Sequence, residues 1–101
     1  MSNIVRKGDF LVFVSVSEQV TEFFISSINI DLDNCFIGRT GRKKVHGCFG
    51  FRLCDGYYYE PGDNYLITRK ATLEERDRFL RWLKKKGHKI NLNTMEITLN
   101  R

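Results

Sequence analysis

The sequence predicts a single α+β domain over residues 1–101. Its expected form is a curved, mostly antiparallel sheet or a small open barrel, SH3-like or similar, with one helix in the C-terminal half and a short closing hairpin. Short apolar runs separated by turn residues fill the first two thirds of the chain, as in a sheet of several strands. Residues 73–86 carry start and stop signals of a helix. With 101 residues, 42% of them hydrophobic, the chain suits one core.

A hairpin is expected at the start of the chain. The turn at 7–9 precedes the run 10–16, which is rich in β-branched and aromatic residues and too short for a typical helix. The first half of this run is apolar on both faces, which favours a central or strongly curved strand. Residues 17–19 form a turn, and the loose alternation of 20–30 predicts the partner strand.

The next expected segments are a turn at 31–34, a strand at 35–37, a Gly-flanked basic loop at 38–44, an alternating strand at 45–53, a tyrosine run at 57–59, a turn at 60–64 and a strand at 65–68. In the alternating strand, His46 and Cys48 are expected on one face and Phe49 and Phe51 on the other. Its glycines mark a bulge, a sharp bend or a close backbone approach.

The helix at 73–86 has the strongest local signals. Thr72 and Glu75 form a T-x-x-E capping box, in which each side chain accepts from the backbone N–H of the other residue. Acidic side chains follow the start and three lysines precede the end, which complements the helix dipole. Gly87 suits a left-handed C-terminal cap. The apolar stripe comprises Phe79, Leu80, Trp82 and Leu83. Residues 88–91 and 95–99 are then expected as a closing hairpin or a single hooked strand.

Charge and cysteine content narrow the function classes. The net charge is +5, and residues 51–101 carry eleven basic against seven acidic side chains, which favours acidic partners such as nucleic acid. Three cysteines cannot all pair within one chain, the first seven residues lack a signal-peptide core, and no run has the length of a membrane span. We therefore expect a cytoplasmic protein with free thiols and no membrane partner.

We expect neither an enzymatic function nor a cofactor. Cys35, His46, Cys48 and Cys54 supply the ligand types of a Cys3His zinc site, but no C-x2-C pair is present. We therefore expect the cysteines to be small half-buried hydrophobes and not metal ligands. A Cys–His nucleophile lacks any recognisable orienting residue or oxyanion loop. The Asp and Glu residues sit at turns and in the helix cap, where local structure explains them.

A basic surface with aromatic residues is the best functional signal. Tyr58 offers a ring for stacking on bases, and lysines and arginines offer contacts to phosphates. The alternative is that the helix-end lysines only complement the dipole. The predicted nucleic-acid-binding residues are Arg39, Arg42, Lys43, Lys44, Tyr58, Lys84, Lys85, Lys86 and Lys89.

The chain resembles small uncharacterised proteins of phages and mobile elements in gut bacteria. The resemblance rests on the K-G-D turn at 7–9, on R-x-A-T-x-E-E at 69–75, and on N-x-x-T-x-E at 91–96. It covers the first fifteen and last thirty-five residues. It implies the order of the turns, strands and helix there, but no catalytic residue. It also implies an accessory protein that acts by binding. We therefore expect a module that engages a polyanion, nucleic acid above all. The alternatives are an inhibitor or adaptor that binds a host protein, and a protein that sequesters a nucleotide.

Overall fold

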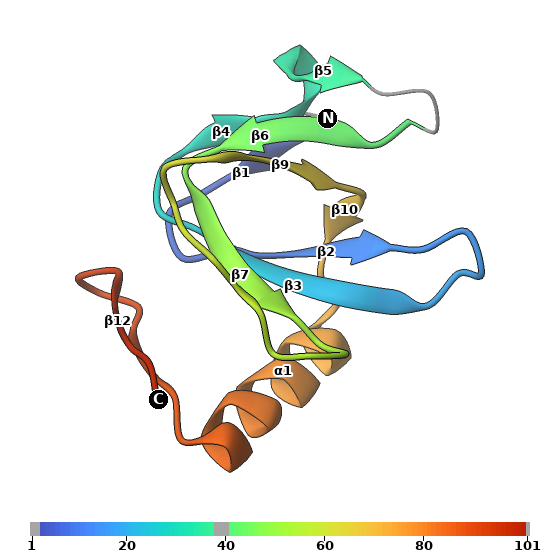
Figure 1. Cartoon of the computed structure of the whole chain (residues 1–101). Helices are drawn as coiled ribbons and strands as arrows, with labels where there is room; N and C mark the ends of the chain where they lie inside the picture. The colour runs from blue at the N-terminus through green and yellow to red at the C-terminus, as the bar shows by residue number, and fades with distance from the viewer. Residues whose placement is uncertain (1–2, 38–40, 101) are drawn as a thin grey trace. The chain divides into compact units, whose positions relative to one another are not determined.

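The computed structural model describes residues 3–37 and 41–100, and the chain divides into two compact units, residues 1–70 and 71–101 (Figure 1). The first unit holds the strands β1 to β10, and the second holds the helix α1 and a hairpin. Every strand pairing among the described residues is antiparallel. The predicted α+β class, mostly antiparallel with one α-helix, is therefore confirmed.

A five-stranded sheet spans the first unit in the order β10-β2-β3-β7-β8. Its strands are Arg69–Lys70, Phe10–Val14, Val20–Ser26, Cys48–Arg52 and Tyr58–Tyr59. The expected hairpin is present as β2 and β3, with Leu11 opposite Phe24. It is shorter than predicted: the register shifts between Phe13 and Val14, β2 ends at Val14, and a turn follows in which Glu18 has a positive φ of 62°.

Gly50 is the middle residue of β7, opposite Phe24 on β3 and Tyr59 on β8. A Cβ atom at Gly50 would lie 1.9 Å from the carbonyl oxygen of Phe23. Only glycine allows the backbones to approach this closely, so the close approach predicted for a glycine in this stretch occurs here.

A three-stranded sheet in the order β5-β6-β9 comprises Phe36–Ile37, Lys43–His46 and Asn64–Ile67. Two predictions are wrong here. Lys43 and Lys44 are not loop residues, because β6 begins at Lys43 and pairs with strands on both sides. The alternating strand 45–53 is two strands, because Gly47, with a φ of +83°, ends β6 and β7 continues in the other sheet.

The core of the first unit lies between these sheets and the short pair β1–β4, Ile4–Val5 with Ile30–Asp31 (Figure 1). The 3-10 helix η1, Leu32–Asn34, replaces the turn predicted there. The buried cluster is Val5, Leu11, Phe24, Ile30, Leu32, Val45, Cys48 and Ile67. Thr68 connects β9 to β10 and joins them to β2, since its N–H donates to Val12 O and its Oγ1 accepts from Val14 N, both at 2.9 Å. The sheets remain open in the described residues, with no closed ring of pairings.

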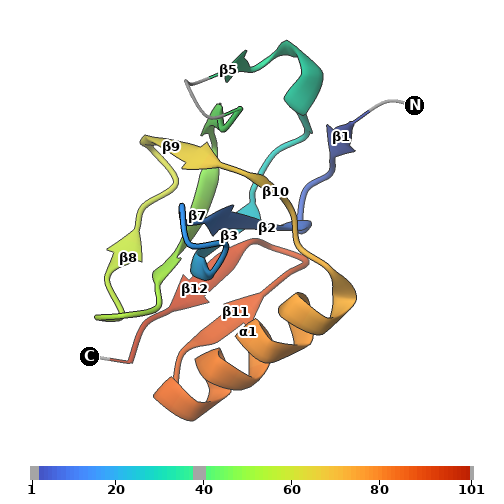
Figure 2. The same ribbon diagram turned by 90° about the vertical axis from the view of Figure 1, so that its right-hand side faces the viewer.

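The second unit contains α1, Leu73–Lys86, followed by the hairpin of β11, Lys89–Asn91, and β12, Glu96–Thr98 (Figure 2). The capping box is present: Thr72 N donates to Glu75 Oε1 at 2.9 Å, and Glu75 N donates to Thr72 Oγ1 at 3.2 Å. Gly87 adopts the left-handed conformation with a φ of 82°. The predicted helix and closing hairpin are confirmed. Within the described part of the chain, none of the helical segments combines the length and apolarity of a membrane span.

Candidate polyanion-binding surface

The second unit carries most of the positive charge. Residues 71–101 contain eight Lys and Arg against four Asp and Glu, which gives +4 of the total +5. Lys86 is exposed and has no carboxylate within ion-pair distance among the described residues. The same holds for four other cations, Arg81, Lys84, Lys85 and Lys89. We call these four residues the basic face.

Helical spacing brings three members of the basic face together. Lys84 and Lys85 follow Arg81 by three and four residues, so the three side chains are neighbours on one side of α1. Lys89, on β11, lines the same pocket as Lys84. Like charges at these spacings weaken a helix slightly. The dipole accounts for cations in the last turn, but it does not account for Arg81 or for Lys89.

Sequence reasoning identified Lys84, Lys85 and Lys89 but missed Arg81. The i, i+3, i+4 pattern from Arg81 to Lys85 is visible in the sequence once the helix limits are known. Arg81 therefore belongs with the predicted lysines.

Lys86 lies differently from the other lysines. Its Nζ is 6.0 Å from the centroid of the Trp82 ring, and its carbonyl oxygen accepts a hydrogen bond from Asn100 Nδ2 at 2.8 Å. Trp82 also lies beside His88, with ring centroids 6.1 Å apart. The Lys86 side chain is exposed but lies toward the Trp82 ring, and we leave it out of the basic face.

A pocket of about 230 Å³ opens beside the C-terminal end of α1. Leu80, Leu83 and Ile90 supply apolar walls, and Lys84 and Lys89 contribute cations. Gly87 and His88 complete it. His88 Nδ1 accepts from the backbone N–H of Asn100 at 3.0 Å, and burial, together with the nearby Lys86, lowers the pKa of His88. The ring is therefore neutral at pH 7.

The other predicted cluster lies in the first unit. Arg42 is half-buried: its guanidinium carbon lies 4.4 Å from the centroid of the Phe13 ring, and Nη2 donates to Val14 O at 2.7 Å. Lys43 and Lys44 are consecutive in β6, so their side chains point to opposite faces, and only Lys44 is exposed. Arg39 lies outside the described residues. Of the described members of this cluster, Lys43 and Lys44 lie in a strand and Arg42 contacts Phe13 and Val14, so these three residues do not form an anion-binding loop.

Tyr58 also lies in the first unit and packs against Phe51, with ring centroids 5.4 Å apart. Burial, with a smaller effect of Glu60, raises the pKa of Tyr58. Tyr59 packs on Phe24 and donates to Glu22 Oε1 at 2.8 Å, while Tyr57 is exposed beside Arg52. The ring most accessible for stacking is therefore that of Tyr57.

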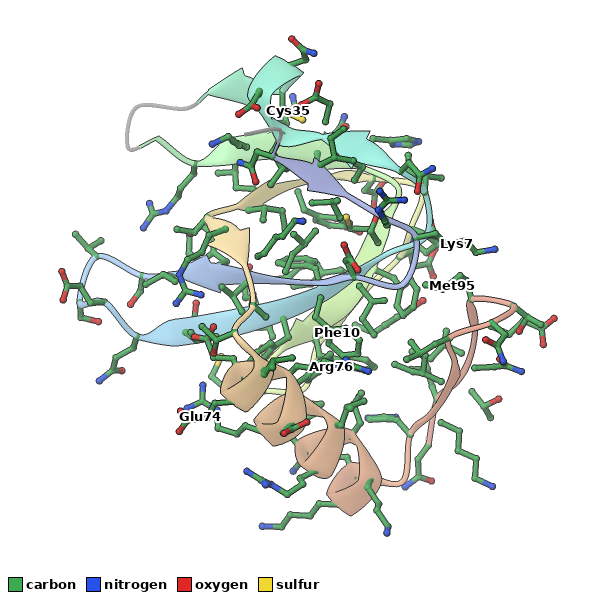
Figure 3. All side chains as sticks on the ribbon, turned by 180° about the vertical axis from the view of Figure 1, so that it is seen from behind. Lys7, Phe10, Cys35, Glu74, Arg76 and Met95 are labelled. Carbon is green, nitrogen blue, oxygen red and sulfur yellow. The ribbon has the colours of Figure 1, made fainter. Side chains whose placement is uncertain are left out.

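The candidate zinc ligands do not come together. His46 is exposed on β6, whereas Cys48 is fully buried on β7, because Gly47 turns the chain between them. The prediction that they share a face is therefore wrong. Cys35 lies between η1 and β5 (Figure 3). Cys54 is exposed. Among residues 3–37 and 41–100, no three His, Cys, Asp or Glu side chains form a group that could hold a metal ion.

Comparison of the chain with protein families, curated proteins and solved structures finds no match.

Proposed function

We propose that the protein is a non-catalytic accessory module that binds a polyanion, nucleic acid above all, through the basic face of its second unit. The observation that carries the proposal is the set of four exposed cations, Arg81, Lys84, Lys85 and Lys89, for which the described chain provides no carboxylate partner. A phosphate backbone supplies the missing counter-charges at short intervals.

The charge sequence along α1 limits how a polyanion approaches. Glu74 lies in the first turn (Figure 3), and Glu75 and Asp77 follow it. A hollow that reaches from the start of the helix to its middle is lined by Glu74 and Glu75 together with Arg78 and, at its far end, Arg81 of the basic face. Because carboxylates repel phosphates, the proposed contact crosses the C-terminal half of α1 and β11 and does not run along the whole helix.

The number of contacts sets the expected salt dependence. Neutralising a phosphate releases condensed counterions, so affinity falls with salt with a slope of about −0.7 per contact for single strands and about −0.9 for duplexes. If all four cations of the basic face bind phosphates, the slope of log K against log salt is roughly −3.

The test is fluorescence anisotropy with labelled single-stranded DNA, duplex DNA and RNA at two or more salt concentrations. A Lys84→Ala/Lys85→Ala variant is compared with Lys43→Ala/Lys44→Ala, which removes the same charge from the first unit. We expect the first variant to lose about tenfold in affinity and between one and two units of salt slope. We expect less than a threefold loss for the second. No binding of any oligonucleotide at low salt would refute the proposal.

A host protein is the second candidate partner, and a different surface supports it. Tyr57 is 57% exposed, and the Arg52 guanidinium carbon lies 5.2 Å from its ring centroid, next to the edge strand β8. Tyrosine and arginine are enriched at the energetic centres of protein interfaces. Nuclease-resistant capture of one host protein, lost in Tyr57→Ala but retained in Lys84→Ala/Lys85→Ala, would favour this function.

A further inference from the structure

The pocket at the end of α1 adds a second kind of surface to the basic face. Leu80, Lys84 and Gly87 follow one another at spacings of four and three, so they lie along one side of the helix. Leu83 and Ile90 extend the apolar lining. Lys84 therefore belongs both to the basic face and to the pocket, and the two surfaces are continuous.

We infer that this pocket accepts an unpaired base of a single-stranded nucleic acid while Lys84 and Lys89 contact the flanking phosphates. This inference rests on the proposed function. Its basis is the combination of apolar walls with cations, which complements a base and its phosphates. An apolar ligand without charge would leave both lysines unused.

The size and polarity of the pocket fit this occupant. Its volume of about 230 Å³ is below the range typical of pockets for drug-sized ligands and suits one planar ring system. The neutral His88 ring supplies a π-face without adding charge. Bases in a duplex are stacked and paired, so the pocket is accessible only to an unpaired base.

The pocket is expected to accept different bases. The helix-end carbonyls of Leu83 and Lys84 already accept hydrogen bonds from His88 N–H at 3.0 Å and Gly87 N–H at 3.1 Å. Groups that are satisfied in this way contribute little to reading a base edge. Apolar walls and a ring face accept any base, because every base has a π-face.

The chain offers a matched pair of variants for the test. Ile90 on β11 and Ile97 on β12 are directly opposed and both half-buried, but only Ile90 lines the pocket. Ile90→Phe fills the pocket, and Ile97→Phe makes the same change outside it. Circular dichroism of both variants shows whether the fold is retained.

Affinity is measured for a single-stranded oligonucleotide, for an abasic oligonucleotide of the same length and charge, and for a duplex. We expect the wild-type protein to prefer the base-containing strand over the abasic one by about fivefold or more, as stacking of one base implies. Ile90→Phe removes this preference and leaves duplex binding and salt slope unchanged, while Ile97→Phe behaves as wild type. Trp82, the single tryptophan, lies beside His88, so its fluorescence should change with base-containing strands only.

The outcomes separate this inference from the proposed function. Equal affinity for abasic and base-containing strands would overturn the base pocket and leave polyanion binding intact. A base preference that persists in Ile90→Phe would also overturn it, whereas no binding of any strand would refute both proposals. If Ile90→Phe abolished binding of a host protein and left the base preference unchanged, the pocket would belong to a protein partner.

Discussion

The guanidinium of Arg42 lies over the ring of Phe13, with 4.4 Å between the guanidinium carbon and the ring centroid. The same side chain donates to the carbonyl oxygen of Val14 at 2.7 Å. These contacts join the residue before β6 to the end of β2, where the register with β3 shifts. Arg42 thus stabilises the first unit, although its sequence neighbours suggested an anion-binding loop.

Replacing Arg42 should therefore reduce stability more than binding. Arg42→Ala loses a cation–π contact and a hydrogen bond from a charged donor, which together contribute about 1–2 kcal/mol at a half-buried site. Arg42→Lys should recover little, because lysine lacks the planar fork. The free energy of unfolding in urea and the affinity for single-stranded DNA measure the two effects. An unchanged unfolding midpoint with a tenfold loss of affinity would contradict the assignment.

Gly50 should tolerate no side chain. The Cβ of Gly50→Ala would meet backbone atoms of Phe23 and Phe24, which cannot move without separating β3 from β7. We expect a loss of more than about 3 kcal/mol, or no folded protein. Gly62→Ala is the matched control, since nothing lies within 4 Å of its added Cβ, and it should change stability by less than about 1 kcal/mol. Thermal unfolding of both variants checks the prediction, and equal stabilities would refute it.

The three thiols should react at different rates. Cys54 is exposed, Cys35 is half-buried with a pKa raised by burial and by Asp31, and burial raises the pKa of Cys48 to about 11. Because the thiolate is the nucleophile, a disulfide reagent at pH 8 should give one fast thiol, which Cys54→Ser removes. Cys48 should react only on unfolding. A fast thiol that remains in Cys54→Ser would contradict this order, and one zinc per chain by elemental analysis would restore the metal hypothesis.

Mild acid should destabilise the second unit through His88. Burial and Lys86 lower the folded pKa of His88, so the unfolded chain binds the proton more readily. The stability from neutral His88 is thus present above the unfolded pKa of about 6.5 and is lost as the pH falls below it. Urea unfolding at pH 7.5 and 5.5, followed by Trp82 fluorescence, should show a smaller loss in His88→Asn than in the wild type.

Two other residues bear on the interpretation of this experiment. His46→Asn makes the same change at the other histidine, which is exposed, and serves as the matched control variant. The pKa of Asp55 is lowered to about 2 by hydrogen bonds from Arg52 and from Tyr57 N–H, so its ion pair with Arg52 persists at both pH values. An equal loss of stability in His88→Asn and wild type would assign the effect to another group.

The features that could be predicted from the sequence depend on neighbouring residues. The limits of α1 follow from the Thr72–Glu75 capping box, from the charge gradient and from Gly87, all of which act within one or two helical turns. The β2–β3 hairpin and the β11–β12 hairpin likewise join segments separated by short turns. Three of the four cations of the basic face could be found in the same way, because they lie at or just after the helix end.

The features that required the tertiary structure depend on distant partners. Lys43 and Lys44 belong to a strand only because β9, about twenty residues later, pairs with β6, and no local signal separates such a strand from a basic loop. Gly47 could mark a bulge or a corner, and which one depends on whether the next residues pair with β3. Arg42 is half-buried in the first unit because Phe13 and Val14, which are distant in sequence, contact its side chain. Pairing between segments far apart in sequence therefore decided the roles of these residues, since their local sequence is compatible with several structures.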